Sequence, residues 1–199
     1  MKWGLPKIIR VDNGGPFASV GAAGLSRLSA WWTVLGIGVE FIAPGHPEQN
    51  GAHEQMHGVL KAETTRPVST TKRAQQRRMN RWLGIYNQQR PHEALGQRTP
   101  AERYRRSGRE YRQAKQPVYP AYWETRRVRS NGQIRWQGRL RFAGEAFVGW
   151  RLGLKPLQGG NREVYLGSVL VGELRASDAG GLRPTAYVRQ RPTNPTQKV

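Results

Sequence analysis

The sequence predicts an α/β segment followed by a small all-β barrel. Two observations support this fold class. Up to about residue 105, short runs rich in β-branched residues alternate with stretches of helical periodicity. From about Tyr119, the pattern changes to short apolar runs separated by glycines, which is typical of several short strands. The 199 residues suffice for one ordinary domain or two small ones.

The α/β segment should open with a strand, a helix and a second strand. Residues 7–12, KIIRVD, read as a strand that ends at an Asn-Gly-Gly turn, with Asp12 at its carboxyl end. Apolar residues then recur at helical spacing over residues 25–35, and Gly36 can end that helix. Residues 39–43, VEFIA, form the second expected strand.

A second helix should begin near Asn50. At 100° per residue, Glu54 lies almost opposite the centre of the apolar residues, and Lys61 lies within about 40° of Glu54. Glu54 should therefore point away from whatever this helix buries. The apolar residues of the helix are Met56, Val59 and Leu60.

A longer amphipathic helix should follow, and then a short helix that begins at Thr99. Thr99 can cap the short helix, Pro100 suits its first position, and Glu102 completes a capping box. The longer helix has an expected apolar face of Met79, Trp82, Leu83 and Tyr86, surrounded by Arg73, Arg77, Arg78 and Arg81.

The all-β part should contain a hairpin around Ser-Asn-Gly at residues 130–132. A three-residue loop with Gly132 left-handed would pair Val128 with Ile134 and put Trp136 on the same face. Further strands are expected at residues 139–142, 146–152, 162–166 and 169–174. The solvated face of the hairpin would carry Arg127, Arg129 and Arg135.

Composition predicts an anionic partner. Lys and Arg total 33 against 13 Asp and Glu, a formal net charge of +20, and most of these cations are arginine. Such an excess repels itself unless a polyanion neutralises it, so nucleic acid is the favoured partner, ahead of an acidic membrane or protein surface. The chain has no cysteine, which excludes disulfides and thiolate metal sites. Without a signal peptide or a long apolar run, we expect an intracellular protein and no membrane span.

Residues 53–57, HEQMH, match the H-E-x-x-H zinc-protease motif. The motif here would lie in the first turn of its helix, whereas a zinc protease holds it mid-helix in a cleft. The extended pattern also fails, because Leu60 and Glu63 stand where it requires Gly and His. His92, Glu93 or Glu63 would have to supply a third ligand. Zinc proteolysis is therefore the weakest of the functional hypotheses.

Three blocks resemble another class of enzyme. IRVDNGGPF, FIAPGHPEQNGAHEQMHGVLK and YNQQRPHEALGQRTPAERY occur in the order found in DDE-type transposases, the retroviral-integrase-like enzymes of bacterial insertion sequences. The resemblance covers about residues 1–105 and implies part of a ribonuclease H-like catalytic core. RRVRSNGQIRWQGRLRFAGEAF is similar to the small C-terminal β-barrel of some of these transposases.

The resemblance implies a metal-dependent site. In that family, three carboxylates hold two divalent ions, usually Mg²⁺ and alternatively Mn²⁺, for in-line phosphoryl displacement. The family's second Asp falls on Asp12 and its Glu on Glu54, so both become candidate catalytic residues and metal ligands. Lys61 falls on the family's basic contact to the DNA end. The expected DNA-binding residues are Lys61, Asn50, Arg73, Arg77, Arg78, Arg81, Arg127, Arg129 and Arg135.

The family's first Asp has no counterpart, since no Asp or Glu precedes Asp12. We therefore expect a truncated element or the downstream half of a split gene, inactive on DNA by itself. Its partners would be DNA and the missing N-terminal half or a full-length transposase, in the cytoplasm or at the bacterial nucleoid. The alternative is a non-catalytic basic fragment that binds DNA and interferes with full-length transposase. The oligomeric state and the recognised DNA ends stay open. The expected organisation is a partial core at 1–106, a linker at 107–118, a barrel at 119–175 and a disordered tail at 176–199.

Overall fold

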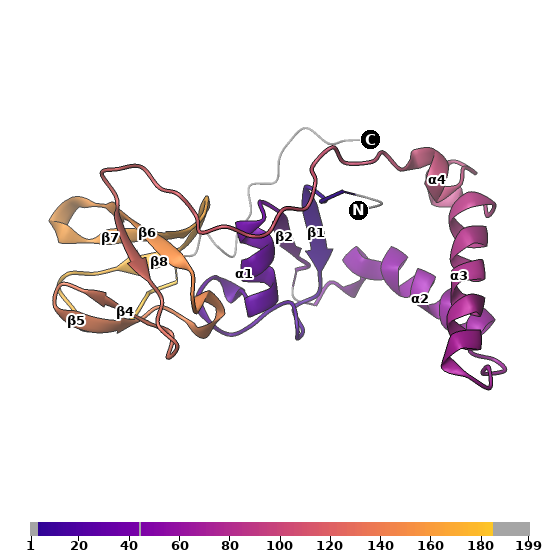
Figure 1. Cartoon of the computed structure of the whole chain (residues 1–199), viewed down its shortest axis with the longest axis horizontal. Helices are drawn as coiled ribbons and strands as arrows, with labels where there is room; N and C mark the ends of the chain where they lie inside the picture. The colour runs from indigo at the N-terminus through magenta and orange to yellow at the C-terminus, as the bar shows by residue number, and fades with distance from the viewer. Residues whose placement is uncertain (1–3, 44, 185–199) are drawn as a thin grey trace. The chain divides into compact units, whose positions relative to one another are not determined.

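A computed structural model describes residues 4–43 and 45–184, which divide into two compact units (Figure 1). The sheet unit contains residues 5–42 and 111–184, and the helical unit contains Gly4, Ala43 and residues 45–110. In the part of the chain thus described, no helix combines the length and the apolar character needed to cross a bilayer.

The sheet unit begins with the expected strand, helix and strand. Strand β1 (Ile8–Val11) pairs in parallel with β2 (Gly38–Phe41), with Ile8 opposite Gly38 and Val11 opposite Phe41. Helix α1 (Arg27–Val34) begins with a capping box between Ser26 and Ser29. Gly36, with φ of 71°, ends the helix in the left-handed conformation, as predicted. The 3₁₀ turn η1 (Ala22–Gly24) precedes α1.

The rest of the sheet unit is antiparallel. A four-stranded sheet has the order β3-β6-β7-β8, and β4 and β5 form a separate two-stranded sheet. The expected strand at 146–152 is wrong in position, because Gly144 and Gly149 adopt positive φ and turn the chain before β6. The elements are β3 (Glu124–Arg127), β4 (Gln133–Trp136), β5 (Arg139–Phe142), η4 (Glu145–Phe147), β6 (Arg151–Pro156), η5 (Gln158–Gly160), β7 (Arg162–Leu166) and β8 (Val169–Leu174).

The described strands do not close into the expected barrel, and the pairing around residues 130–132 explains why. The three-residue loop is present, with Gly132 left-handed at φ of 76°. The backbone of Val128, however, exchanges hydrogen bonds with Gly149 and Trp150, so the predicted ladder from Val128 to Ile134 does not form. The Arg126 side chain instead reaches across to β4, where its Nε donates to the carbonyl oxygen of Arg135 at 2.9 Å.

The core of the sheet unit combines both of its chain segments. Val128, Ile134 and Trp136 are buried together, as predicted. Leu25 and Ala30 from the first segment belong to the same hydrophobic cluster. The unit therefore joins residues that the predicted boundaries assign to different domains, and those boundaries stay a prediction.

Part of the predicted tail at 176–199 is described and packs on the sheet unit. The backbone of Arg183 pairs with that of Glu173 in an antiparallel bridge, and the N–H of Leu182 donates to the carbonyl oxygen of Phe142 at 2.7 Å. Residues 185–199 lie outside the described part of the chain.

The helical unit is built from α2 and α3. Trp82 is buried on α3, and Met79 and Tyr86 are half-buried, as predicted. Leu83 is 51 % exposed, which corrects the predicted apolar face. Packing follows the narrow stripe from Trp82 to Tyr86, and Leu83 lies about 60° beyond Tyr86 and about 100° from Trp82. The capping box of Thr99 and Glu102 is confirmed. The elements are η2 (Pro47–Asn50), α2 (Gly51–Thr64), α3 (Lys72–Gln88), η3 (Glu93–Leu95) and α4 (Pro100–Arg103).

Candidate functional site

Asp12 lies directly after β1, at the carboxyl end of the parallel pair. Its Oδ1 accepts a hydrogen bond from the N–H of Gly14 at 3.0 Å, which stabilises the turn. The neighbouring Asn13 Nδ2 donates to the carbonyl oxygen of Ile42 at 2.9 Å, so the turn is tied to the end of β2. Asp12 itself is exposed. Its carboxylate is therefore held on a fixed turn and remains accessible to a cation.

Glu54 lies in the first turn of α2, in the helical unit. It is exposed, as is Lys61, whereas Met56, Val59 and Leu60 are half-buried. The predicted orientation of this helix is therefore confirmed. The amino end of a helix also carries partial positive charge, which favours a carboxylate at this position. Asn50 is the N-cap residue of the same helix.

The two candidate carboxylates belong to different units, Asp12 to the sheet unit and Glu54 to the helical unit. Their joint action on a metal ion therefore stays a prediction. The donor chemistry fits, because exposed carboxylate oxygens are the ligands that Mg²⁺ and Mn²⁺ prefer. Among residues 4–43 and 45–184, no three His, Asp or Glu side chains gather in an arrangement that could hold a metal ion.

The HEQMH residues lie on the exposed side of α2. The Nε2 atoms of His53 and His57 are 3.0 Å apart, and their ring centroids are 4.3 Å apart. Of the conceivable third ligands for a zinc protease, Glu63 is engaged elsewhere: its carboxylate accepts from Trp82 Nε1 at 2.6 Å and from Arg90 Nη2 at 2.8 Å. The described residues therefore lack the three-ligand centre that zinc proteolysis requires.

A network that the sequence did not reveal joins α2 to α3. Arg90, in the YNQQRPHEAL block, holds the Glu63 carboxylate, and this interaction lowers the pKa of Glu63 below its ordinary value. The ring of Tyr86 stacks on Trp82 and is met edge-on by His92. Sequence patterns could not indicate this pair, because Glu63 lies 27 positions before Arg90.

The α3 arginines differ in how free their side chains are. Arg78 donates to the carbonyl oxygens of Glu63 at 3.0 Å and Pro67 at 2.6 Å, so its guanidinium closes the carboxyl end of α2. The main role of the Arg78 guanidinium is therefore structural, because it already donates hydrogen bonds to the backbone. Arg73, Arg77 and Arg81 are exposed.

Arginines of the sheet unit fall into structural and exposed groups. Arg141 is only 1 % exposed, lies over the Trp136 ring and faces Asp178 at 3.5 Å, so it belongs to the core. Arg126 and Arg162 both bind the carboxylate of Glu124. Arg127, Arg129 and Arg135, the predicted DNA-binding arginines of this unit, are exposed and have no ion pair among the described residues.

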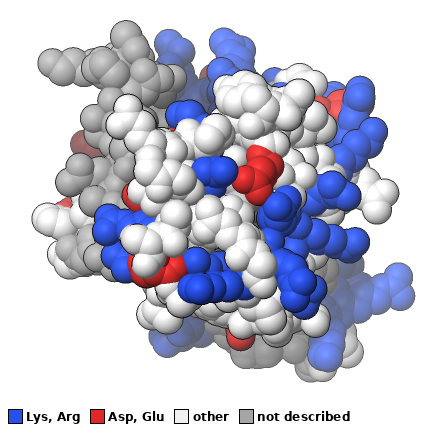
Figure 2. Space-filling model, turned by 90° about the vertical axis from the view of Figure 1, so that its left-hand side faces the viewer, with Lys and Arg blue, Asp and Glu red and all other residues white. Residues whose placement is uncertain are grey.

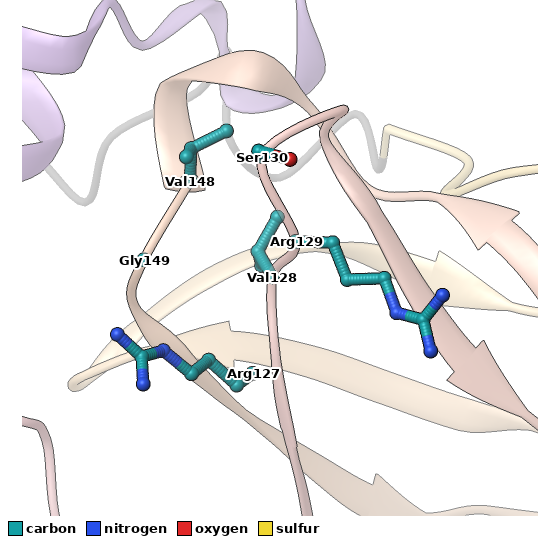
Figure 3. A pocket seen from close by; sticks show the side chains of 6 residues that line it. All are labelled: Arg127, Val128, Arg129, Ser130, Val148 and Gly149. Carbon is teal, nitrogen blue, oxygen red and sulfur yellow. The ribbon is translucent and has the colours of Figure 1, made fainter.

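Basic side chains are spread widely over the face seen in Figure 2, with few acidic ones among them. A shallow hollow of about 480 Å³ lies between Arg127 and Arg129, with Val128, Ser130, Val148 and Gly149 completing its lining. In Figure 3 the guanidinium groups of Arg127 and Arg129 extend away from each other on either side of Val128. Guanidinium groups placed in this way can bind two separate anionic groups. They do not concentrate positive charge inside the hollow.

Comparison with protein families gives two matches in chain order. Residues 35–100 match the integrase core domain, a segment that contains Glu54, Lys61 and the α3 arginines. Residues 123–177 match the C-terminal domain of IS481 family transposases, a segment that contains Arg127, Arg129 and Arg135. Asp12 precedes the first matched segment.

Two curated relatives come from insertion elements. The insertion element IS407 uncharacterized 31.7 kDa protein of Burkholderia multivorans is 33 % identical over 100 residues, or 50 % of this chain and 34 % of that protein. The insertion element IS476 uncharacterized 39.2 kDa protein of Xanthomonas euvesicatoria is 35 % identical over 100 residues, or 50 % of this chain and 27 % of that protein. The chain thus spans about a third or less of these relatives. Over residues 35–100 and 123–177, the chain is therefore similar to an integrase core domain and to the C-terminal domain of IS481 family transposases.

Proposed function

We propose that this chain takes part in DNA transposition, as part of a transposase that transfers DNA strands by metal-dependent phosphoryl transfer. One observation carries the proposal: an integrase core match and a transposase C-terminal match follow each other in one polypeptide. The formal net charge of +20 supports it, because a DNA substrate supplies the neutralising charge. By the same proposal, β1, α1, β2 and α2 form part of a ribonuclease H-like core, and the chain acts at the bacterial nucleoid.

In this proposal Asp12 and Glu54 are catalytic residues and ligands for Mg²⁺ or Mn²⁺. The ion would activate the attacking oxygen and stabilise the leaving oxygen of the phosphoryl displacement. Lys61 and Asn50, on the same helix as Glu54, would bind the DNA end, since a cation beside the carboxylate draws in a phosphate. Arg73, Arg77 and Arg81, with Arg127, Arg129 and Arg135, would bind the flanking DNA backbone, while Arg78 mainly supports α2.

These 199 residues by themselves would not cut or join DNA. The resemblance implies three carboxylates around two ions, and the chain has no Asp or Glu before Asp12 to serve as the first. Sequence upstream of these residues, in the same or in a separate polypeptide, would supply it. The second candidate function follows from the exposed arginines: without such a partner, the chain is a non-catalytic DNA-binding protein that competes with full-length transposase for DNA.

A strand-transfer assay tests the proposal. The chain is incubated with Mg²⁺ and duplexes that carry the ends of its own insertion element, with and without a polypeptide that supplies the upstream strands of the core. We expect no product from the chain alone and strand transfer in the mixture. Glu54→Gln should abolish that transfer, because an amide replaces a carboxylate ligand.

Glu110→Gln is the matched control, since it removes an exposed carboxylate of the helical unit outside the matched segments and should leave strand transfer unchanged. Strand transfer that persists in Glu54→Gln would refute the catalytic role. DNA binding with no strand transfer in any mixture would leave the second candidate function.

A further inference from the structure

The two histidines of HEQMH form a second group of donors that phosphoryl transfer does not use. His53 and His57 are both exposed, and their spacing of four residues puts them on one side of α2. Their Nε2 atoms are 3.0 Å apart, and the two rings meet edge to face with an interplanar angle of 75°. The two imidazoles thus bring the same kind of nitrogen close together on the exposed side of α2.

The separation of these nitrogens suits a chelated ion of defined geometry. Imidazole nitrogens bind first-row divalent ions at about 2.0–2.1 Å. Two nitrogens 3.0 Å apart, each at about 2.05 Å from one ion, subtend an angle of about 94° at that ion. A tetrahedral ion would need a separation of about 3.3 Å at the same bond length. The observed separation therefore fits adjacent positions of a square-planar or octahedral ion better than it fits tetrahedral zinc.

We propose that His53 and His57 form a two-imidazole site for a first-row divalent ion that favours square-planar or tetragonal coordination, Cu²⁺ before Ni²⁺, with water in the remaining positions. The preference follows from donor type and geometry, since nitrogen ligands at such angles are typical of Cu²⁺ and Ni²⁺. Mg²⁺ is excluded from the pair because it prefers oxygen donors. Helix α2 already holds the two rings together, so binding costs little additional ordering.

The simplest alternative is a hydrogen bond between the two rings, because 3.0 Å also suits one ring N–H donating to the other nitrogen. The two interpretations differ in what a metal does. A chelate binds one ion per pair and loses most of its affinity when either imidazole is removed. A hydrogen-bonded pair without metal affinity shows neither property. The site does not depend on the proposed role of Glu54 in DNA transposition.

Calorimetric titration of the full chain with Ni²⁺, and separately with Cu²⁺, tests the site. His53→Gln and His57→Gln should each lower the affinity for either ion by about tenfold or more, since a ligand contributes at least as much as an outer-shell partner. The double variant should bind at least as weakly as either single variant, because one substitution breaks the chelate and the second removes the remaining imidazole. Both histidines are exposed, and an unchanged circular dichroism spectrum would verify the fold of each variant.

His46→Gln is the matched control. His46 is also exposed but its Nδ1 is bonded to Glu48 Oε1 at 2.7 Å, so this substitution should leave Ni²⁺ affinity unchanged. Hydrogen exchange gives an independent readout: Ni²⁺ should slow exchange of the α2 amides in the native chain and have no such effect in His57→Gln. Equal Ni²⁺ affinity in the native chain and in His57→Gln would overturn the proposal. A loss of Ni²⁺ affinity in His46→Gln, with none in His57→Gln, would also overturn it.

Discussion

Replacing Arg127, Arg129 and Arg135 together by glutamine should make DNA binding less sensitive to salt. These side chains are exposed and have no ion pair among the described residues, so their charges are available for phosphate groups. Each phosphate contact contributes about 0.9 to the slope of log affinity against log salt concentration, and three contacts contribute about 2.7. Between about 50 and 200 mM salt, the native chain should therefore lose about 40-fold more affinity than the triple variant.

Fluorescence anisotropy with a labelled duplex, measured across that salt range, gives both slopes directly. The control is the corresponding triple lysine variant, which keeps the three charges and should keep the slope of the native chain. A glutamine variant with the native slope would refute the reasoning, because it would mean that none of the three arginines contacts phosphate. A lysine variant that loses the slope would show that the effect comes from altered structure and not from charge.

Three further predictions concern stability. Gly153→Ala should destabilise the sheet unit by about 1–3 kcal/mol, because the added methyl group would overlap the Tyr119 ring. Faster hydrogen exchange in β6 and β7 should show this loss of stability. The same substitution should cost almost nothing in a chain that already carries Tyr119→Ala. Phe147→Ala removes a fully buried ring and should cost about 3–5 kcal/mol in denaturant titration of the sheet unit, whereas a cost below 1 kcal/mol would contradict the packing described. The lowered pKa of Glu63 predicts that its contribution to the helical unit is present above the ordinary value of 4.5 and is lost as the pH falls through the lower folded-state pKa. Glu63→Gln should flatten this acid dependence in the far-ultraviolet circular dichroism signal, and an unchanged dependence would contradict the assignment.

Local patterns predicted the elements that depend on local physics. The Asn-Gly-Gly turn stops β1 at Val11, directly before Asp12, because those residues favour a turn. The angular position of Glu54 relative to Met56 predicted the exposed side of α2, because helical geometry is regular. Thr99 and Glu102 form the expected capping box, because the two residues are only three positions apart and their interaction is local.

Partners distant in the sequence could not be predicted in this way. The alternation around Val128 shows that one side is buried, but it does not show that β3 pairs with β6 instead of β4. The choice depends on competing long-range hydrogen bonds. Where the predicted ladder is missing, the side chain of Arg126 donates a hydrogen bond to the backbone of β4. Likewise, the helical pattern of α3 indicated a buried side, yet Leu83 is exposed because the helices next to α3 cover a narrower stripe than the pattern suggests.

The order of the chain through its two units has a consequence during synthesis. The sheet unit takes residues 5–42 first, and its chain resumes only at Tyr111, after the helical unit has been made. Its last strand ends at Leu174, 132 residues after Ile42 (174 − 42). At a translation rate of about 5–20 residues per second, Leu25 and Ala30 would wait about 7–26 s for the strands that bury them. On the ribosome, this amino-terminal stretch is thus a candidate client for chaperones that shield apolar segments.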